Sequence, residues 1–202
     1  MKQARVAVLV SGGGTNLQAL IDAQAAGKLP HAQLSLVISN KADAYALERA
    51  QRAKIATAIV LRRECADGVE FEDRIVSLLQ ENEIDLIVLA GFMAILSERF
   101  TSRFAKRIVN VHPSLIPSFC GKGFYGLHVH EAALSYGVKV TGATVHFVNE
   151  IPDGGEIILQ QAVKIRKGDT PESLQRRVME QAEWKILPRA VELVCRDICK
   201  KK

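Results

Sequence analysis

The sequence predicts a single α/β domain in which a mostly parallel twisted sheet carries helices on both faces. Two observations lead to this fold class. Segments with strand and helix character alternate along the chain, which is the pattern of repeated strand–helix–strand units. The expected strands are continuous apolar runs, as strands are when both faces of a parallel sheet are covered. With 202 residues, of which 48% are hydrophobic, the chain fits one domain that buries its own core.

Strands are expected where short runs of β-branched and aliphatic residues occur. These runs lie at residues 6–10, 34–39, 56–60, 84–90, 108–112 and 140–148. Helices are expected at residues 17–21, 44–53, 70–80, 129–136 and from 170 to the end of the chain. Pro171 suits a first helical turn, whereas Pro188 predicts a break in the final helix. No repeat or linker divides the sequence into two domains.

The formal net charge is +5, from 27 Lys and Arg against 22 Asp and Glu. This small surplus suits an anionic ligand, and the terminal Lys200, Lys201 and Lys202 are interpreted as a solvated end rather than a nucleic-acid arm. No apolar run approaches the roughly 18 residues of a membrane span, and no signal sequence precedes the first strand. We therefore expect a cytoplasmic protein with small-molecule partners, without nucleic-acid or membrane partners.

The four cysteines are Cys65, Cys120, Cys195 and Cys199. They form no C-x-x-C pair, and no His lies at zinc-ligand spacing from them. We therefore expect neither a disulfide framework nor a metal site, and we interpret Cys195 and Cys199 as small buried side chains of a helix.

A glycine-rich turn, Ser11-Gly12-Gly13-Gly14-Thr15-Asn16, joins the first expected strand to the first expected helix. The backbone N–H groups of such a turn and the positive end of the helix dipole favour a phosphate, and Ser11, Thr15 and Asn16 add side-chain donors. The dinucleotide pattern fails because position 17 is Leu, and the nucleoside-triphosphate loop fails because Gly-Lys-Ser/Thr is absent. The turn therefore predicts a monophosphate on a small substrate, and its plain alternative is a tight turn without a ligand.

Asn110 and His112 are two polar residues two positions apart on an otherwise apolar strand, so both side chains face the same side near its carboxyl end. Ligands bind at that end of the strands in open α/β sheets. An amide that donates to an oxyanion and a His that donates and later gives up a proton fit the transition state of acyl transfer. A charged His needs a carboxylate, and Asp153 in the loop 149–155 is the candidate. The alternatives are a buried Asn–His pair satisfied by backbone and an Asp-Gly-Gly segment that only turns the chain.

Six motifs together resemble the phosphoribosylglycinamide formyltransferases, a family of folate-dependent enzymes of purine biosynthesis. The motifs are residues 11–18, 39–44, 89–93, 110–117, 141–148 and 153–155, and their order and spacing match over nearly the whole chain. The resemblance implies a Rossmann-like formyltransferase fold in one domain, residues 1–202, whose N-terminal half binds the phosphorylated substrate and whose C-terminal half binds folate and carries out catalysis. The implied reaction moves the formyl group of the co-substrate 10-formyltetrahydrofolate to the amine of glycinamide ribonucleotide. Its products are formylglycinamide ribonucleotide and tetrahydrofolate, and no metal takes part.

The resemblance also implies a role for individual residues. Asn110 and His112 would stabilise the oxyanion, and Asp153 would raise the pKa of His112. The implied substrate-binding residues are Gly13, Gly14, Thr15, Asn16 and Glu183. The implied folate-binding residues are Arg62, Phe92, Met93, Ala94, Ile95, Leu96, Asn110, Val148, Asn149, Glu150 and Ile151.

Three departures from the family pattern affect the expected site. Ala94 stands where the family often has Arg, Gly68 lies where a second Arg is expected, and Trp184 stands where His is common. Arg62 or Arg63 is the substitute for the second Arg. Three competing hypotheses stay open: a hydrolase that releases formate from the same carrier, a transferase acting on another amine, and a non-catalytic nucleotide-binding module. The sequence also leaves open whether the chain forms a homodimer.

Overall fold

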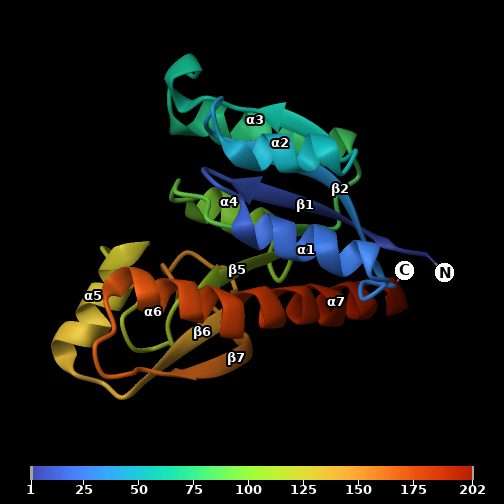
Figure 1. Ribbon diagram of the computed structural model, residues 1–202. Coiled ribbons are helices and arrows are strands. Elements are labelled where there is room, and N and C mark those ends of the chain that lie inside the picture. Colours follow the sequence, from blue (N-terminus) through green and yellow to red (C-terminus); the bar gives the residue numbers. More distant parts are fainter. Residues whose placement is uncertain (1, 202) are drawn as a thin grey trace.

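The computed structural model describes residues 2–201, which form a seven-stranded sheet flanked by helices (Figure 1). The strand order is β3-β2-β1-β4-β5-β6-β7, in which β1 to β5 are parallel and β6 is antiparallel to both its neighbours. The strands are β1 (Ala4–Val10), β2 (Ala32–Ser39), β3 (Ala56–Ile59), β4 (Leu86–Leu89), β5 (Ile108–His112), β6 (Val140–Phe147) and β7 (Ile157–Lys164). The predicted mostly parallel sheet is confirmed.

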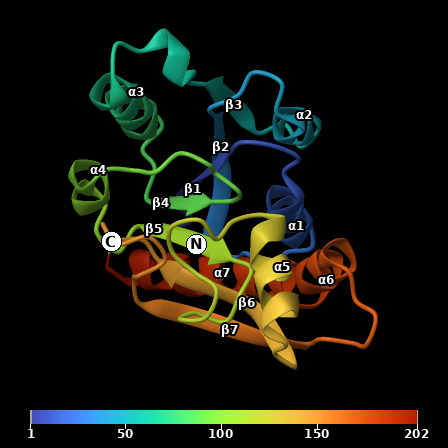
Figure 2. The ribbon, with the colours of Figure 1, turned by 90° about the vertical axis from the view of Figure 1, so that its left-hand side faces the viewer.

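Helices cover both faces of the sheet, as Figure 2 shows. The strand β1 has side chains in two separate cores because its residues alternate between the faces: Val6 and Val8 pack on one side, and Ala7 and Leu9 on the other. The first core is completed by α1 (Thr15–Ala25), α2 (Tyr45–Arg52), α6 (Pro171–Val178) and α7 (Trp184–Lys200). The second is completed by α3 (Gly68–Glu81) and α4 (Glu98–Arg103). The remaining helices are α5 (Leu127–Tyr136), a short 3₁₀ helix η1 (Arg62–Glu64) and a π-helical turn η2 (Met179–Glu183).

The strand order reverses at β1, because β2 lies on one side of it and β4 on the other. Two loops leave the carboxyl ends of these neighbouring strands: the glycine-rich turn after β1 and the segment 90–97 after β4. Open α/β sheets bind their ligands at such a crevice. The topology thus brings two of the sequence motifs, separated by some eighty positions, to one edge of the sheet.

The predicted break at Pro188 is wrong. The helix α7 continues through this proline to Lys200, and the irregularity lies earlier, in the π-helical turn that ends at Glu183. A proline ring inside a helix presses against the carbonyl four residues before it, here that of Trp184. Trp184 is the first residue of α7, so this carbonyl belongs to the first turn of the helix, directly after the π-helical turn. Burial of Ile186, Leu187 and Val191 then keeps the helix against the sheet.

Besides the short η1, one strand and one helix had no counterpart in the sequence-based expectations. The strand β7 is an edge strand with mostly exposed or half-buried residues, so it lacks the apolar run that distinguishes the inner strands. The helix α4 has only six residues and is capped by Ser97, whose hydroxyl accepts from the N–H of Phe100. Among residues 2–201, no helix combines the length and the apolar character needed to cross a membrane.

Candidate active site

The side chains of Asn110 and His112 lie at the carboxyl end of β5. The antiparallel pairing of β5 with β6 places His146 opposite Asn110 and Thr144 opposite His112. His112 and His146 are both buried. The sequence analysis did not single out His146, although an imidazole in the small and apolar strand 140–148 is itself a signal.

The Asp153 carboxylate lies between two histidine rings. Its Oδ2 is 3.5 Å from Nδ1 of His112, and its Oδ1 is 3.5 Å from Nε2 of His146. The backbone N–H of Gly121 donates to Oδ2 at 2.8 Å. Burial acts to raise the pKa of Asp153, but the contacts with His146, Gly121 and His112 outweigh it and hold that pKa below its usual value. Asp153 is therefore a carboxylate at neutral pH.

The glycines after Asp153 let this loop fold tightly against β6. A Cβ at Gly155 would lie 1.7 Å from the carbonyl oxygen of Phe147, and one at Gly154 would lie 2.6 Å from the Ile151 side chain. Asp153 itself adopts a left-handed backbone conformation, with φ at 55°. Together these features place the Asp153 carboxylate beside the end of β5. A loop that served only to connect two strands would not need such close packing.

The hydrogen bonds of the two histidines indicate where their protons lie. Nε2 of His112 is 2.8 Å from the carbonyl oxygen of Phe119, and Nδ1 of His146 is 2.8 Å from that of Phe147. A carbonyl only accepts, so each of these nitrogens carries a proton. Nε2 of His146 lies 3.2 Å from Nδ2 of Asn110 and 3.5 Å from Oδ1 of Asp153, so it accepts from the Asn110 amide when it carries no proton and donates to the Asp153 carboxylate when it does. The contact with His146 orients the Asn110 amide, whose second N–H is held only by a 3.5 Å contact with Oδ1 of Asp153.

Two opposing effects determine the pKa of His112. Burial lowers the pKa of His112 below its ordinary value, and this effect outweighs the Asp153 carboxylate and the Phe119 carbonyl, which raise it. His130 on α5 is a second buried ring of this region: burial lowers its pKa to about 4, with a further contribution from His112. Asp153 therefore acts on the pKa of His112 in the expected direction, but desolvation is the larger effect and sets the net direction.

The glycine-rich turn closes against α2 and presents its backbone to solvent. Gly14 has φ at 71°, and a Cβ there would lie 2.6 Å from that of Ala46. The backbone N–H groups of Gly13, Gly14 and Thr15 have no hydrogen-bond partner among residues 2–201. Unpaired N–H groups at the start of α1 are donors that an anion can use.

All three polar side chains expected to donate in this turn already have a partner within the protein. The Thr15 hydroxyl donates to the Met179 sulfur at 3.8 Å and Nδ2 of Asn16 donates to Oε2 of Glu183 at 2.7 Å, whereas the Ser11 hydroxyl accepts from the backbone N–H of Met93 at 2.8 Å. The π-helical turn directs Glu183 inward, where burial raises its pKa to about 7 and the Asn16 amide acts against that rise. Glu183 and Asn16 therefore lie together as one polar pair beside the turn.

A cavity of about 160 Å³ adjoins the Asn110–His146–Asp153 cluster. One wall comes from the segment after β4 and the other from the loop after β6. The expected folate-binding residues that line it are Phe92, Ala94, Ile95, Leu96, Asn110, Val148, Asn149, Glu150 and Ile151. The structure thus brings nine of the eleven residues to one cavity, next to Asp153.

Met93 and Arg62 do not line this cavity. Met93 is largely exposed, and its backbone N–H is used by Ser11. Arg62 in η1 stacks over the ring of Phe71 at 5.7 Å, and a Cβ at Gly68 would lie 2.9 Å from its guanidinium. Its side chain therefore occupies the space beside Gly68, where the family pattern has an arginine. Within residues 2–201, no group of three or more His, Cys, Asp or Glu side chains is placed to hold a metal ion.

Comparison with known sequences connects this site to one family. A sequence model described as formyl transferase matches residues 4–191. The phosphoribosylglycinamide formyltransferase of Haemophilus influenzae is 47% identical over 188 residues, which are 93% of this chain and 85% of that protein. The human trifunctional purine biosynthetic protein adenosine-3 is 49% identical over 195 residues. That match covers 96% of this chain, which spans only 18% of the human protein.

Solved structures agree with the sequence matches. The crystal structure of glycinamide ribonucleotide transformylase 1 from Symbiobacterium toebii superposes with a TM-score of 0.90 at 40% identity, covering 96% of this chain and 89% of that one. A formyltetrahydrofolate deformylase from Pseudomonas syringae superposes with a TM-score of 0.85 at 26% identity. That match covers 97% of this chain and 62% of the deformylase.

Proposed function

Because the chain belongs to the formyl transferase family, we propose that it transfers the formyl group of 10-formyltetrahydrofolate to the amine of glycinamide ribonucleotide. The products are formylglycinamide ribonucleotide and tetrahydrofolate, and the reaction is a step of de novo purine biosynthesis. We place the enzyme in the cytoplasm, with these small molecules as its partners. Its relatives named phosphoribosylglycinamide formyltransferase support this choice of acceptor.

The observation that carries the proposal is the position of Asp153. Its carboxylate lies 3.5 Å from Nδ1 of His112 and lines the same cavity as Asn110 and the segment after β4. A flat pterin ring fits between the two walls of this cavity, where backbone amides and apolar side chains face it. The glycine-rich turn lies directly beside that segment, joined to it by the bond from Met93 to Ser11. The amine of a phosphorylated acceptor held at the turn would thus be directed toward the formyl carbon.

The residues of the site divide the chemistry among them. The acceptor amine attacks the formyl carbon, and one N–H of Asn110 donates to the oxyanion that forms. His112 in its protonated form donates a hydrogen bond from Nε2 to the same oxygen once the Phe119 carbonyl gives way, and the Asp153 carboxylate favours this charged form of the ring, which keeps its proton when the intermediate collapses. The new C–N bond is complete when the bond to the folate nitrogen breaks. The amine loses one proton and the folate nitrogen gains one, so the reaction is balanced.

The test is a turnover assay with both substrates, following the formation of tetrahydrofolate. We expect His112→Ala and Asp153→Asn to lower kcat at least ~10²-fold, as the loss of an oxyanion donor or its partner does. His128→Ala is the matched control, because His128 is an exposed histidine of α5. Unchanged turnover in the His112 and Asp153 variants, with the fold intact, would exclude this mechanism.

The hydrolase is the main alternative, since one structural relative is named a formyltetrahydrofolate deformylase. The feature that favours a transferase is the pair of Asn16 and Glu183 beside the glycine-rich turn, a polar site that water as an acceptor would not need. Formate release is therefore the decisive measurement. We expect little formate without glycinamide ribonucleotide, and rapid formate release in its absence would identify a hydrolase.

A further inference from the structure

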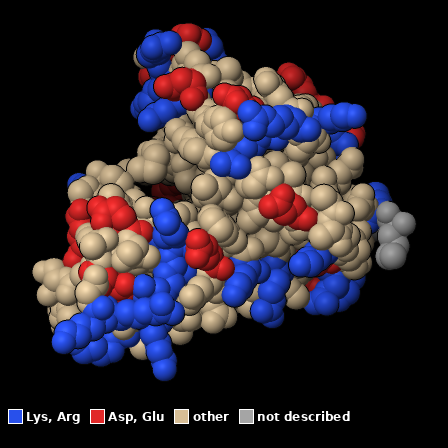
Figure 3. Space-filling view, viewed as in Figure 1, with Lys and Arg blue, Asp and Glu red and all other residues tan. Residues whose placement is uncertain are grey.

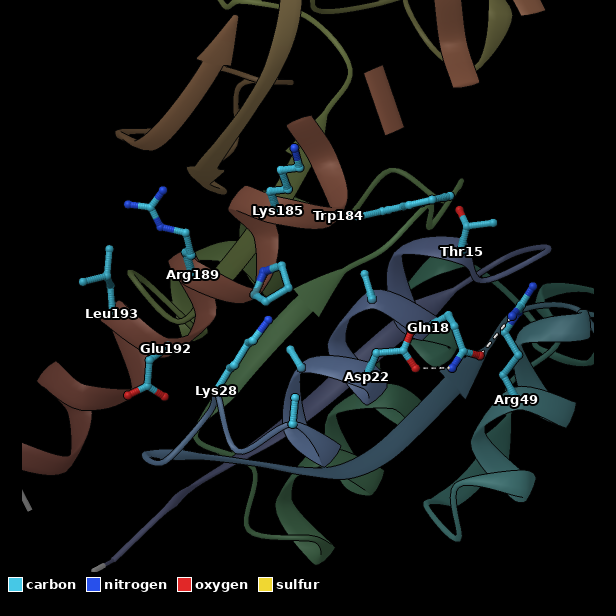
Figure 4. A pocket seen from close by; sticks show the side chains of 14 residues that line it. Thr15, Gln18, Asp22, Lys28, Arg49, Trp184, Lys185, Arg189, Glu192 and Leu193 are labelled. Carbon is cyan, nitrogen blue, oxygen red and sulfur yellow. Dashed lines mark hydrogen bonds between the residues drawn. The ribbon is translucent and has the colours of Figure 1, made fainter. Parts of the chain in front are cut away.

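A second cavity, of about 870 Å³, lies outside the catalytic cluster, in a groove between α1 and α7 (Figure 4). Its apolar floor comes from Ala19, Ala23 and Ala26 on or next to α1 and from Pro188 on α7. The volume is within the range of small-molecule sites, roughly 300–1,000 Å³. Thr15 at one end is the part of the glycine-rich turn that lines this groove.

The charged side chains of the groove leave an excess of free cations. Lys28, Lys185 and Arg189 line it, and no ion pair or hydrogen bond engages their side chains within residues 2–201. Its two acids are occupied: Asp22 accepts from the Gln18 amide at 2.8 Å, and Glu192 accepts from the backbone and ring of His31. Figure 3 shows Lys and Arg side chains gathered over α7 on the same face. The groove is thus complementary to an anion.

The groove also contains an aromatic side chain with an unused donor. Trp184 lines it, and its Nε1 is buried without a hydrogen-bond partner. A buried indole N–H ordinarily has an acceptor, so the vacant donor indicates a polar ligand atom. In Figure 4, Trp184, Lys185 and Arg189 come from the α7 wall of the groove, and Gln18 and Lys28 come from α1 and the turn that follows it, on the opposite wall. Cations therefore reach the groove from both walls, and the aromatic side chain comes from α7.

We propose that this groove binds a nucleoside phosphate. The phosphate would pair with Lys185, Arg189 and Lys28, because Lys and Arg form charge-assisted hydrogen bonds with phosphate oxygens. The flat base would lie against Trp184, because bases stack on indole rings. The Nε1 donor of Trp184 would contact a polar atom of the base or sugar. This inference does not depend on the formyl-transfer reaction.

Trp184 is the only tryptophan of the chain, so its fluorescence reports the groove directly. The experiment titrates the full chain with adenosine 5′-monophosphate, and with adenosine and inorganic phosphate separately, and repeats the titrations by calorimetry. We expect the monophosphate to change the Trp184 emission and to bind at least tenfold more tightly than either part. Phosphate binding as tightly as the nucleotide would overturn the proposal, as would no binding of the nucleotide at millimolar concentration.

Variants separate the groove from the glycine-rich turn, which also attracts phosphate. Arg189→Gln and Lys185→Gln are expected to weaken nucleotide binding at least tenfold each while kcat/KM for formyl transfer stays unchanged. Arg196→Gln is the control, an exposed arginine of α7 that does not line the groove. Nucleotide binding that is unaffected by Arg189→Gln and competes with glycinamide ribonucleotide would place the nucleotide at the turn, and the proposal would fall. If the nucleotide changes the Trp184 emission only when the oligomeric state also changes, the groove is an interface with a second copy of the chain. That result would also overturn the proposal.

Discussion

Ser11 and Met93 join the two loops of the candidate active site by one hydrogen bond. The backbone N–H of Met93 donates to the Ser11 hydroxyl at 2.8 Å, although 82 positions separate the two residues. Ser11 is buried at the first position of the glycine-rich turn, and Met93 lies in the segment that forms one wall of the catalytic cavity. The distance between the two proposed substrate positions thus depends on this contact.

Ser11→Ala tests that dependence. The substitution leaves the Met93 N–H without its acceptor, and because this bond is only partly buried the cost should be about 1 kcal/mol. We expect urea unfolding to show a loss of that order and steady-state kinetics to show KM rising several-fold for both substrates, with a smaller change in kcat. Ser77→Ala is the control, because the exposed Ser77 hydroxyl donates only to the Asp73 carbonyl of its own helix. If both KM values stay unchanged, the bond does not position the loops.

Gly14→Ala tests the shape of the glycine-rich turn. Gly14 has φ at 71°, and a new Cβ would lie 2.6 Å from Cβ and 2.8 Å from Cα of Ala46, so both strain and a clash with backbone follow. Residues held in this region cost about 1–3 kcal/mol, and thermal unfolding should show at least that loss. At the neighbouring Gly13 a Cβ meets nothing within 4 Å, so Gly13→Ala should leave the unfolding temperature nearly unchanged. Equal effects of the two substitutions would contradict this account.

Glu183 predicts a pH dependence of stability. Burial raises its pKa in the folded chain to about 7 from the ordinary 4.5, so the folded state binds a proton that the unfolded state has lost between these pH values. The contribution of Glu183 to the unfolding free energy is therefore fully present below pH 4.5 and is lost as the pH rises through about 7. Relative to Glu183→Gln, the wild type should lose on the order of 3 kcal/mol of unfolding free energy over this window. Denaturant unfolding at several pH values measures the difference, and parallel curves for the two proteins would refute it.

His146→Phe tests the histidine that sequence reasoning missed. The substitution removes the acceptor that orients the Asn110 amide and a partner of Asp153, so we expect kcat to fall about tenfold with little change in KM. The bond with His146 is the strongest of the contacts that lower the pKa of Asp153. Without it that pKa rises, and the acidic limb of the pH–rate profile should move to higher pH. A lower kcat with an unmoved acidic limb would indicate damage to packing only.

Much of the fold could be predicted from the sequence because strands and turns depend mainly on residues that are close together in the chain. The apolar run of β4 is buried on both faces, and the glycine-rich turn directly follows the strand that it was expected to follow. The spacing of Asn110 and His112 on one strand also needed no tertiary information, because the two-residue period of a strand sets it. The edge strand β7 was not predicted because its side chains are mostly exposed and form no apolar run.

Other properties arise only when distant segments meet. His146 lies next to Asn110 because β5 pairs with β6. Asn16 donates to Glu183 because α1 packs against the C-terminal helical segment. The pKa direction of His112 followed from desolvation, which depends on how completely other elements cover the ring and outweighed the carboxylate that local reasoning favoured. Composition and spacing thus specify which residues can form strands, turns and polar pairs. Burial and partner choice are properties of the packed chain, since each sums contributions from segments far apart in sequence.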